Sequence, residues 1–189
     1  MADGENLTAN AVILTAPVPQ SLMLLEKSGV ALSAVLINRL CAIQYERCLA
    51  VMAVLDAPSG LSAPGGFAPE EGPVAWMADN QMKGVSAEPA ITLHANHEFS
   101  LAHWDRDRDE TARILLDAAA RWLGGGIKAF QVHGWRYSKP MQVDSQPCAV
   151  IGTESPLVLA GDAFCGSRVE GAFLSGWAAA EAVIASGSR

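Results

Sequence analysis

The sequence lacks any apolar run of about 18 residues, the length that a membrane-spanning helix needs. It opens with an acidic and polar segment, residues 1–6, which is the opposite of a secretory signal. Basic residues are in the minority, 13 against 20 acidic residues, and the formal net charge is -7. We therefore expect a cytoplasmic protein that binds neither membrane nor nucleic acid, because the basic surface that such partners attract is missing.

Cysteine is scarce, and its spacing forms no Cys-x-x-Cys pair. The four cysteines are Cys41, Cys48, Cys148 and Cys165. Free cysteine in a reducing compartment behaves as a small apolar residue. The sequence therefore predicts buried free thiols.

Charged residues make up only 17% of the chain, whereas half of the residues are hydrophobic. This balance argues against a disordered chain. A chain of 189 residues should bury about 70% of its unfolded surface, enough for one domain or for one domain and a piece of another.

Apolar periodicity predicts alternating strands and helices. The clearest helix spans 107–123, with apolar residues on one face and a run of three glycines at its end. Other helices are expected at about 19–29, 32–43 and 169–185, and strands at 11–17, 45–55, 74–80, 91–97, 127–137 and 157–160. The segment 57–73 is rich in proline and glycine, and it is either a flap over a site or a floppy surface loop.

The strongest chemical feature is the end of the strand at 157–160. Gly161 and Asp162 follow it directly, and a helix begins near Val169. Glycine at a strand end lets a ligand approach the backbone, a carboxylate can accept hydrogen bonds from sugar hydroxyls, and a helix N-terminus attracts electron-rich oxygens. Small residues line one side of the helix, namely Gly171, Ser175, Ala178 and Ala182.

This segment resembles the second flavin-binding motif of glutathione-reductase-like flavoproteins. Its part from Val169 to Ala172 resembles amine oxidases, and the run as a whole resembles bacterial renalase-type proteins. The resemblance implies FAD as cofactor, with Asp162 at the ribityl and pyrophosphate region and backbone amides of 169–172 at the flavin ring. The implied cofactor-binding residues are Gly161, Asp162, Val169, Glu170, Gly171 and Ala172.

Two further segments resemble the same family. Residues 15–20 are similar to its turn from the flavin domain to the substrate domain, and residues 132–140 to a strand beside the flavin. Strand alternation puts Trp135 and Tyr137 on one face and Arg136 on the other. The two aromatic rings are therefore expected to bind a flat substrate, or else to fill a sheet face.

The sequence departs from the family in one large respect, because it contains no Gly-x-Gly-x-x-Gly motif for the pyrophosphate. We expect the C-terminal part of such an enzyme, whether truncated, split or excised. The implied fold is α+β, an antiparallel substrate-domain sheet covered by helices plus the C-terminal strand and helix of a Rossmann-like FAD-binding domain. The expected parts are a flavin-side strand and turn at 1–20, a substrate-binding domain at 21–150 and an FAD-binding segment at 151–189. The resemblance also implies that the strands at 11–17 and 157–160 lie near each other, because both belong to the flavin-domain side in the family.

The activity that the resemblance implies is oxidation of an amine or a dihydronicotinamide-type substrate by hydride transfer to flavin. The alternative is a non-catalytic interaction module or fragment that needs a second chain carrying the missing Rossmann half. Such a module should expose an apolar face where that half would pack.

Two other chemistries are weighed and not favoured. A metal site would draw on the histidines, but His94 and His97 should point to opposite faces of a strand, and no cysteine or carboxylate completes a zinc pattern. A serine hydrolase would need a Gly-x-Ser-x-Gly turn, whereas Ser175 is expected inside a helix.

Overall fold

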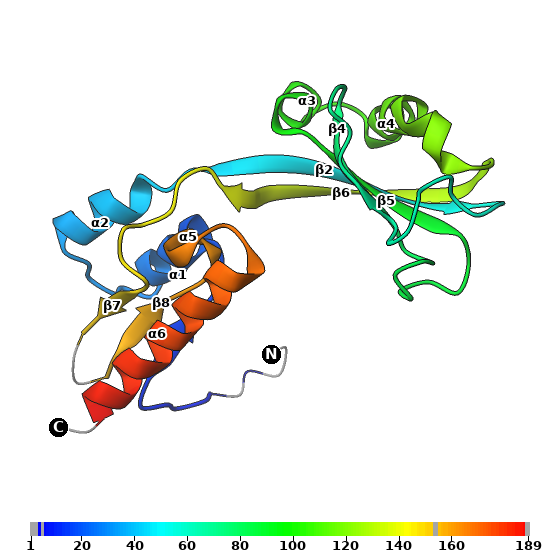
Figure 1. Ribbon diagram of the computed structural model, residues 1–189. Coiled ribbons are helices and arrows are strands. Elements are labelled where there is room, and N and C mark those ends of the chain that lie inside the picture. The colour runs from blue at the N-terminus through cyan, green and yellow to red at the C-terminus, as the bar shows by residue number, and fades with distance from the viewer. Residues whose placement is uncertain (1–3, 5, 153–154, 188–189) are drawn as a thin grey trace. The chain divides into compact units, whose positions relative to one another are not determined.

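The computed structural model describes residues 4, 6–152 and 155–187, which form two compact units (Figure 1). The terminal unit combines residues 1–45 and 139–189, and the central unit contains residues 46–138. Residues 21–45 and 139–150 therefore pack with the two ends of the chain, whereas the sequence analysis grouped them with the substrate domain. The assignment of substrate or flavin binding to each segment stays a prediction.

The central unit is built on a five-stranded antiparallel sheet in the order β3-β4-β5-β2-β6. Its strands are β2 (Tyr45–Leu55), β3 (Gly66–Phe67), β4 (Val74–Asp79), β5 (Ala90–Ala95) and β6 (Ile127–Pro140). In the register of β2 with β5, Val51 lies opposite Leu93 and Ala53 opposite Ile91, and all four side chains are buried. They lie on one face because side chains alternate along a strand.

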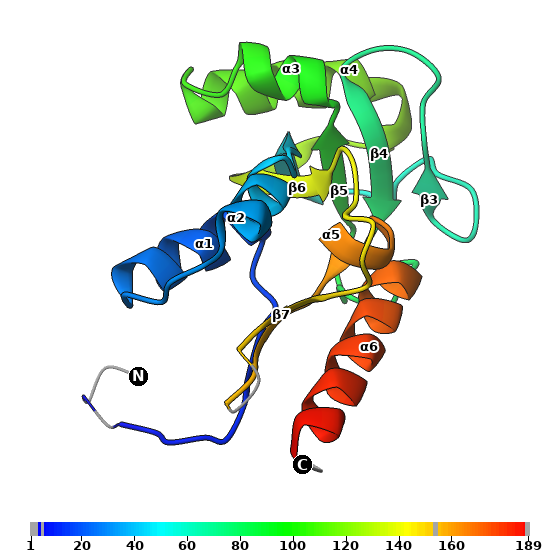
Figure 2. The ribbon, with the colours of Figure 1, turned by 90° about the vertical axis from the view of Figure 1, so that its left-hand side faces the viewer.

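Helices α3 (His97–Ala102) and α4 (Arg108–Leu123) cover that face (Figures 1 and 2). One Asp107 carboxylate oxygen accepts hydrogen bonds from the backbone N–H groups of Asp109 and Glu110, at 3.0 and 2.9 Å, and so caps α4. Gly124 ends the helix with a φ of 74°. The helix predicted at 107–123 is confirmed, and its buried residues are Thr111, Ala112, Leu115, Leu116, Ala119 and Leu123.

The proline- and glycine-rich loop is fixed on the central unit. The N–H of Gly60 donates to the carbonyl oxygen of Trp122 at 2.9 Å, and the hydroxyl of Ser59 donates to the buried Asp79 carboxylate at 2.5 Å. Leu61 enters the hydrophobic core. These contacts contradict the interpretation of 57–73 as a floppy surface loop.

The terminal unit contains a three-stranded sheet in the order β1-β8-β7. β1 (Val12–Leu14) pairs in parallel with β8 (Leu157–Leu159), with Ile13 opposite Val158, and β7 (Ala149–Ile151) pairs with β8 in the antiparallel sense. The expectation that the strands at 11–17 and 157–160 lie together is confirmed, although they come from opposite ends of the chain.

The helices of this unit are α1 (Val18–Lys27), α2 (Ala34–Cys41), α5 (Asp162–Cys165) and α6 (Val169–Gly187). An ion pair fixes the segment between β6 and β7, because Arg39 Nε lies 2.9 Å from the fully buried Asp144 carboxylate. The N–H of Asp144 donates to the carbonyl oxygen of Ala163 in α5. The hydrophobic core includes Val18, Leu25, Leu40, Ile43, Ala149, Leu159, Ala163 and Phe164.

The α+β fold class is confirmed, as a helix-covered antiparallel sheet plus a small mixed sheet. The short elements β3, β7, α3 and α5 were not predicted. The prediction of buried thiols is correct for Cys48 but wrong for Cys41, which is exposed, and Cys148 and Cys165 are half-buried. No helix within the described ranges is long and apolar enough to cross a membrane.

Candidate functional site

A cavity of about 590 Å³ opens at the carboxyl ends of β1 and β8, next to the beginning of α6. Its lining residues are Thr15, Pro17, Ala160, Gly161, Asp162, Ser167, Arg168, Val169, Ala172 and Gly176. Ligands of open α/β sheets bind at the carboxyl ends of parallel strands, and helix N-termini attract anionic groups. The cavity therefore combines the two backbone features that favour a phosphate-containing or electron-rich ligand.

Gly161 joins β8 to α5 with a φ of 143° and a ψ of -165°, a conformation that side chains at Cα disfavour. Its N–H donates a hydrogen bond to the hydroxyl of Ser175 on α6, with a nitrogen–oxygen distance of 3.0 Å, and its carbonyl oxygen accepts from the N–H of Phe164 at 3.2 Å. These contacts fix the strand end at the cavity wall.

Asp162 begins α5, and its side chain is half-buried beside the cavity. Burial raises the pKa of this carboxyl above its usual value, and hydrogen bonds from the backbone N–H groups of Asp162 and Ala163 oppose the shift. Neither of the two ion pairs found among the described residues involves Asp162. The carboxylate is therefore available as an acceptor for hydroxyl groups of a ligand.

Tyr45 brings a phenol to the same region. Its hydroxyl oxygen accepts a hydrogen bond of 3.1 Å from the N–H of Val18, at the beginning of α1. Burial raises the pKa of Tyr45, the bond from Val18 lowers it, and the charge of Asp162 raises it again. The sequence analysis missed Tyr45, because no local pattern connects it with residues so distant in the chain.

The predicted cofactor-binding residues separate into two groups. Gly161, Asp162, Val169 and Ala172 line the cavity, whereas Glu170 is exposed and Gly171 is buried, and neither lines it. A Cβ atom on Gly171 would overlap the backbone of Gly166, whose φ is 131°. Gly171 therefore acts here through close packing of the loop 166–168 on α6.

Arg168 is a cavity residue that the sequence analysis did not select. It directly precedes α6, so its guanidinium adds positive charge where the helix N-terminus already carries a partial positive charge. A basic residue immediately before the predicted helix at 169 was the signal that could have identified it.

Trp135 and Tyr137, the predicted substrate-binding residues, lie on β6 of the central unit. Phe130 and Val132 pack against the helix-covered core, while Trp135 is 52% exposed and its ring lies 4.3 Å from that of His133. Tyr137 is half-buried. Both residues thus belong to the central unit, whereas the cavity belongs to the terminal unit.

The sheet face of the central unit opposite α3 and α4 carries further aromatic residues. Trp76 on β4 lies opposite His94 on β5, and the Trp76 ring covers Gly66. Burial lowers the pKa of His94, and the positive charge of Lys83 lowers it further. The sequence analysis selected neither Trp76 nor His94 for substrate binding.

The histidines and the serine considered for the two other chemistries lie on three different elements, β5, α3 and α6. His97 begins α3, and its Nδ1 accepts a hydrogen bond from the N–H of Arg47, whereas His94 lies on β5. Across the residues that the structure describes, no three histidine, cysteine or carboxylate side chains gather as a metal site. Ser175 lies inside α6 and is engaged with Gly161.

A comparison with models of known protein families identifies the family of this chain. The model of the flavin-containing amine oxidoreductases matches residues 1–184. The chain therefore belongs to the flavin-containing amine oxidoreductase family, and the resemblance found in the sequence is confirmed.

Solved structures show the same fold. A putative protoporphyrinogen oxidase from Exiguobacterium sp. 255-15 has 15% identity and a TM-score of 0.61, over 99% of this chain and 43% of its own. A redesigned putrescine oxidase has 16% identity and a TM-score of 0.57, and the match covers 97% of this chain and 44% of the oxidase. An FAD-dependent oxidoreductase from Pseudomonas aeruginosa has 15% identity and a TM-score of 0.51, and the match covers 95% of this chain and 46% of that oxidoreductase. The chain spans less than half the length of these proteins.

Proposed function

We propose that this chain forms the C-terminal part of an FAD-dependent oxidoreductase and that the cavity at the ends of β1 and β8 binds part of the FAD. The cavity carries the proposal, because two parallel strand ends and the beginning of α6 meet there in a member of a flavin-binding family. Its volume lies within the range of about 300–1,000 Å³ that is usual for small-molecule sites.

The residues around the cavity fit different parts of the cofactor. Asp162 would accept hydrogen bonds from ribityl hydroxyls, since its carboxylate is half-buried and without an ion-pair partner among the described residues. The first N–H groups of α6 and the guanidinium of Arg168 would face electron-rich oxygens of the ring or the pyrophosphate. Bound FAD would supply the hydride acceptor, while these side chains hold and orient it.

The substrate side of the proposal rests on the central unit. Trp135 and Tyr137 would provide aromatic walls for an amine or a dihydronicotinamide-type substrate. Trp76 and His94 extend the aromatic surface on the sheet face that α3 and α4 leave open. The low pKa of His94 favours a neutral imidazole there, which suits a cationic or flat aromatic substrate better than a charged histidine would.

Flavin retention is the first test. The purified chain is incubated with FAD and desalted, and its visible absorbance spectrum is recorded. A flavin band near one per chain supports the proposal, and Asp162→Ala should then lower retention at least about tenfold, through loss of hydrogen bonds to a charged group. Asp117→Ala, at an exposed position on α4, serves as the control and should retain flavin like the unchanged protein.

The interaction module is the second candidate, and the edge of β1 favours it. Val12 donates its N–H to the carbonyl oxygen of Pro156, and Leu14 accepts from Ala160, both toward β8. Ile13 lies between them, so its N–H and carbonyl groups point to the other edge, where none of the described strands pairs. A further parallel strand from another polypeptide segment would satisfy these groups.

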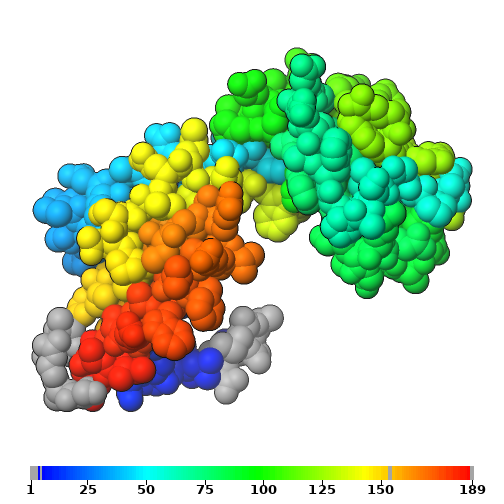
Figure 3. Space-filling view, in the orientation of Figure 1, coloured from blue at the N-terminus to red at the C-terminus, as the bar shows by residue number. Residues whose placement is uncertain are grey.

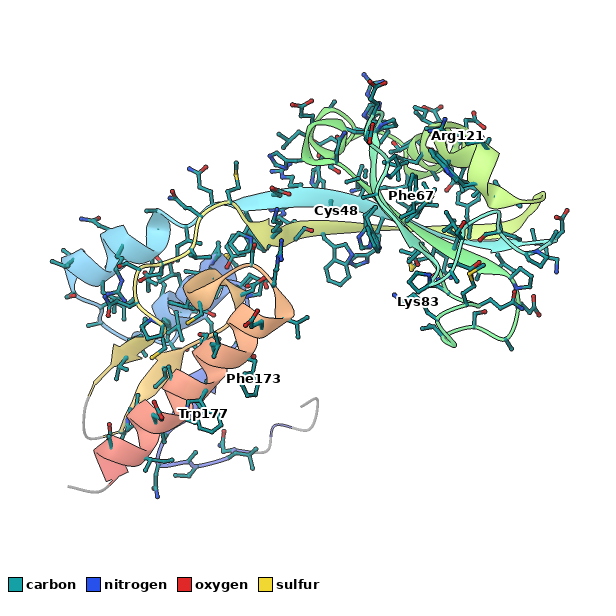
Figure 4. All side chains as sticks on the ribbon, in the orientation of Figure 1. Cys48, Phe67, Lys83, Arg121, Phe173 and Trp177 are labelled. Carbon is teal, nitrogen blue, oxygen red and sulfur yellow. The ribbon has the colours of Figure 1, made fainter. Side chains whose placement is uncertain are left out.

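Helix α6 gives the same indication. It is apolar on nearly all sides, a composition typical of a helix that is covered all round. Phe173 and Trp177 are 63% and 61% exposed and project from it, and α6 lies at the molecular surface (Figures 3 and 4). A second chain with a Rossmann βαβ unit would cover both the strand edge and this apolar surface.

The same flavin experiment separates the two candidates. A colourless but folded chain would favour the module. In that case, Phe173→Ser with Trp177→Ser should weaken the binding of a hydrophobic dye to the protein. Val35→Ser provides the control, because Val35 is an exposed apolar residue on α2 rather than on α6. Equal dye binding by all three proteins would contradict an exposed docking surface on α6.

A further inference from the structure

Two cysteines lie on neighbouring segments of the terminal unit. Cys165 ends α5, and its sulfur lies 3.9 Å from the carbonyl oxygen of Pro147, which directly precedes Cys148. Both thiols are half-buried, so small solutes have partial access to them. In contrast, Cys41 is exposed on α2, and Cys48 is buried in the other compact unit.

Contacts on both sides hold the two cysteine-bearing segments together. The N–H of Asp144 donates to the carbonyl oxygen of Ala163 at 2.7 Å, and the ion pair with Arg39 fixes the Asp144 carboxylate. The segment 144–148 therefore stays against α5 in the folded protein. A disulfide needs Cβ atoms about 3.5–4.5 Å apart, so bridge formation would draw residue 165 toward residue 148.

We propose that Cys148 and Cys165 form an oxidation site, which hydrogen peroxide converts from two thiols to an intramolecular disulfide. In the first step, the Cys165 sulfur attacks one peroxide oxygen, the O–O bond breaks, and hydroxide takes up a proton to leave as water. In the second step, the Cys148 sulfur attacks the resulting sulfenic sulfur, and the S–O bond breaks. The departing hydroxide takes the Cys148 proton as water, so two thiols and one peroxide give one disulfide and two waters.

The order of attack follows from the surroundings of the two thiols. Burial raises the pKa of Cys148, the neighbouring Cys165 raises it further, and Arg39 opposes the shift. Cys148 is therefore less readily deprotonated than an ordinary thiol, and we assign it to the second step.

The modification would act on the cavity wall. Gly166, Ser167 and Arg168 follow Cys165 directly, and the last two line the cavity. Anchoring residue 165 to residue 148 would fix this loop at its beginning, while packing of Gly166 on Gly171 fixes it against α6. Bridge formation itself does not depend on whether the cavity binds FAD.

The test treats the reduced full chain with one equivalent of hydrogen peroxide and maps its cysteines by peptide mass spectrometry. The expected result is a mass loss of about 2 Da, from two hydrogens, in a linked pair of peptides containing Cys148 and Cys165, reversed by dithiothreitol. Cys148→Ser and Cys165→Ser should each abolish this product, whereas Cys41→Ser should leave it unchanged. The mapping of the unchanged protein needs no variant, so misfolding of a variant does not affect it.

Other outcomes would overturn the proposal. They are reduced Cys148 and Cys165 after treatment, sulfinic acid at either position without a bridge, or a bridge to Cys41. Because the readout is covalent, failure here leaves the proposed FAD binding untouched, and a chain without flavin can still form the disulfide.

Discussion

The hydroxyl of Ser175 accepts a hydrogen bond from the N–H of Gly161 at 3.0 Å and thereby ties the middle of α6 to the end of β8. Ser175 is fully buried. The bond therefore determines where the cavity lies. Gly161 lines the cavity on the strand side, and Ala172 and Gly176 line it from α6, the helix that Ser175 holds in place.

Replacement of Ser175 by alanine should therefore leave the N–H of Gly161 without its partner. We expect a loss of about 1–3 kcal/mol in the free energy of unfolding, the usual cost of an unsatisfied buried polar group. Urea denaturation measures it. Ser186→Ala is the matched control on the same helix, because the Ser186 hydroxyl donates only to the carbonyl oxygen of Ala182. Equal stabilities of the two variants would show that the bond to Gly161 is unimportant.

A second prediction uses two glycines of α6. Gly171→Ala should destabilise the protein by about 1–3 kcal/mol, because its methyl group would overlap the backbone of Gly166. Gly176→Ala should instead stabilise it by about 0.5–1 kcal/mol, since no atom beyond its chain neighbours and the backbone of its own helix lies within 4 Å of the added Cβ, and alanine favours the helix. Thermal unfolding of both variants provides the comparison. Opposite signs are the expected result, and two stabilised variants would contradict the close packing at Gly171.

The raised pKa of Asp162 predicts a dependence of stability on pH. The pKa of this carboxyl is higher in the folded protein than in the unfolded chain, where it is about 3.9. The ionised carboxylate therefore destabilises the folded protein increasingly as pH rises from the unfolded-state pKa through the folded-state pKa. Asp162→Asn should thus be more stable than the unchanged protein at neutral pH, and the difference should shrink below about pH 4. The effect should be small because the carboxyl is only partly buried. Urea midpoints at several pH values measure it, and a constant difference would contradict a shifted pKa.

The N-cap of α4 supports a fourth prediction. Asp107→Ala removes an acceptor for the N–H groups of Asp109 and Glu110 and should cost about 0.5–2 kcal/mol. Asp105→Ala is the control, since Asp105 is exposed and lies outside the helix. Chemical denaturation of both variants is the measurement, and we expect the control to stay within about 0.5 kcal/mol of the unchanged protein.

Much of the fold could be predicted from strong local patterns. The amphipathic stretch at 107–123, with an acidic cap and a terminal glycine, has no competing interpretation and forms α4. The apolar runs near residues 12 and 158 predicted two strands, and the family resemblance predicted that these strands lie together. They form the parallel pair β1 and β8. Short elements such as α5 and β7 carry too few residues for a periodic signal.

The candidate site was predicted less completely. Gly161 and Asp162 were identified because glycine and carboxylate directly follow a buried strand. Glu170 belongs to the same motif but is exposed to solvent. The rotation of α6 about its own axis decides which of its residues face the cavity, and the motif alone does not predict this rotation. Tyr45 could not be identified from sequence, because its contact with Val18 depends on how distant segments pack.

The division of the chain has a consequence for the order of folding. Residues 46–138 form one unbroken stretch, so all their partners within that unit are available once residue 138 has been synthesised. β1 must wait for β8, since Ile13 pairs with Val158. Contacts between such distant residues form slowly, because a long loop has to close first. During translation, the central unit is therefore expected to fold first, as an autonomous insertion inside a domain whose own sheet is completed last.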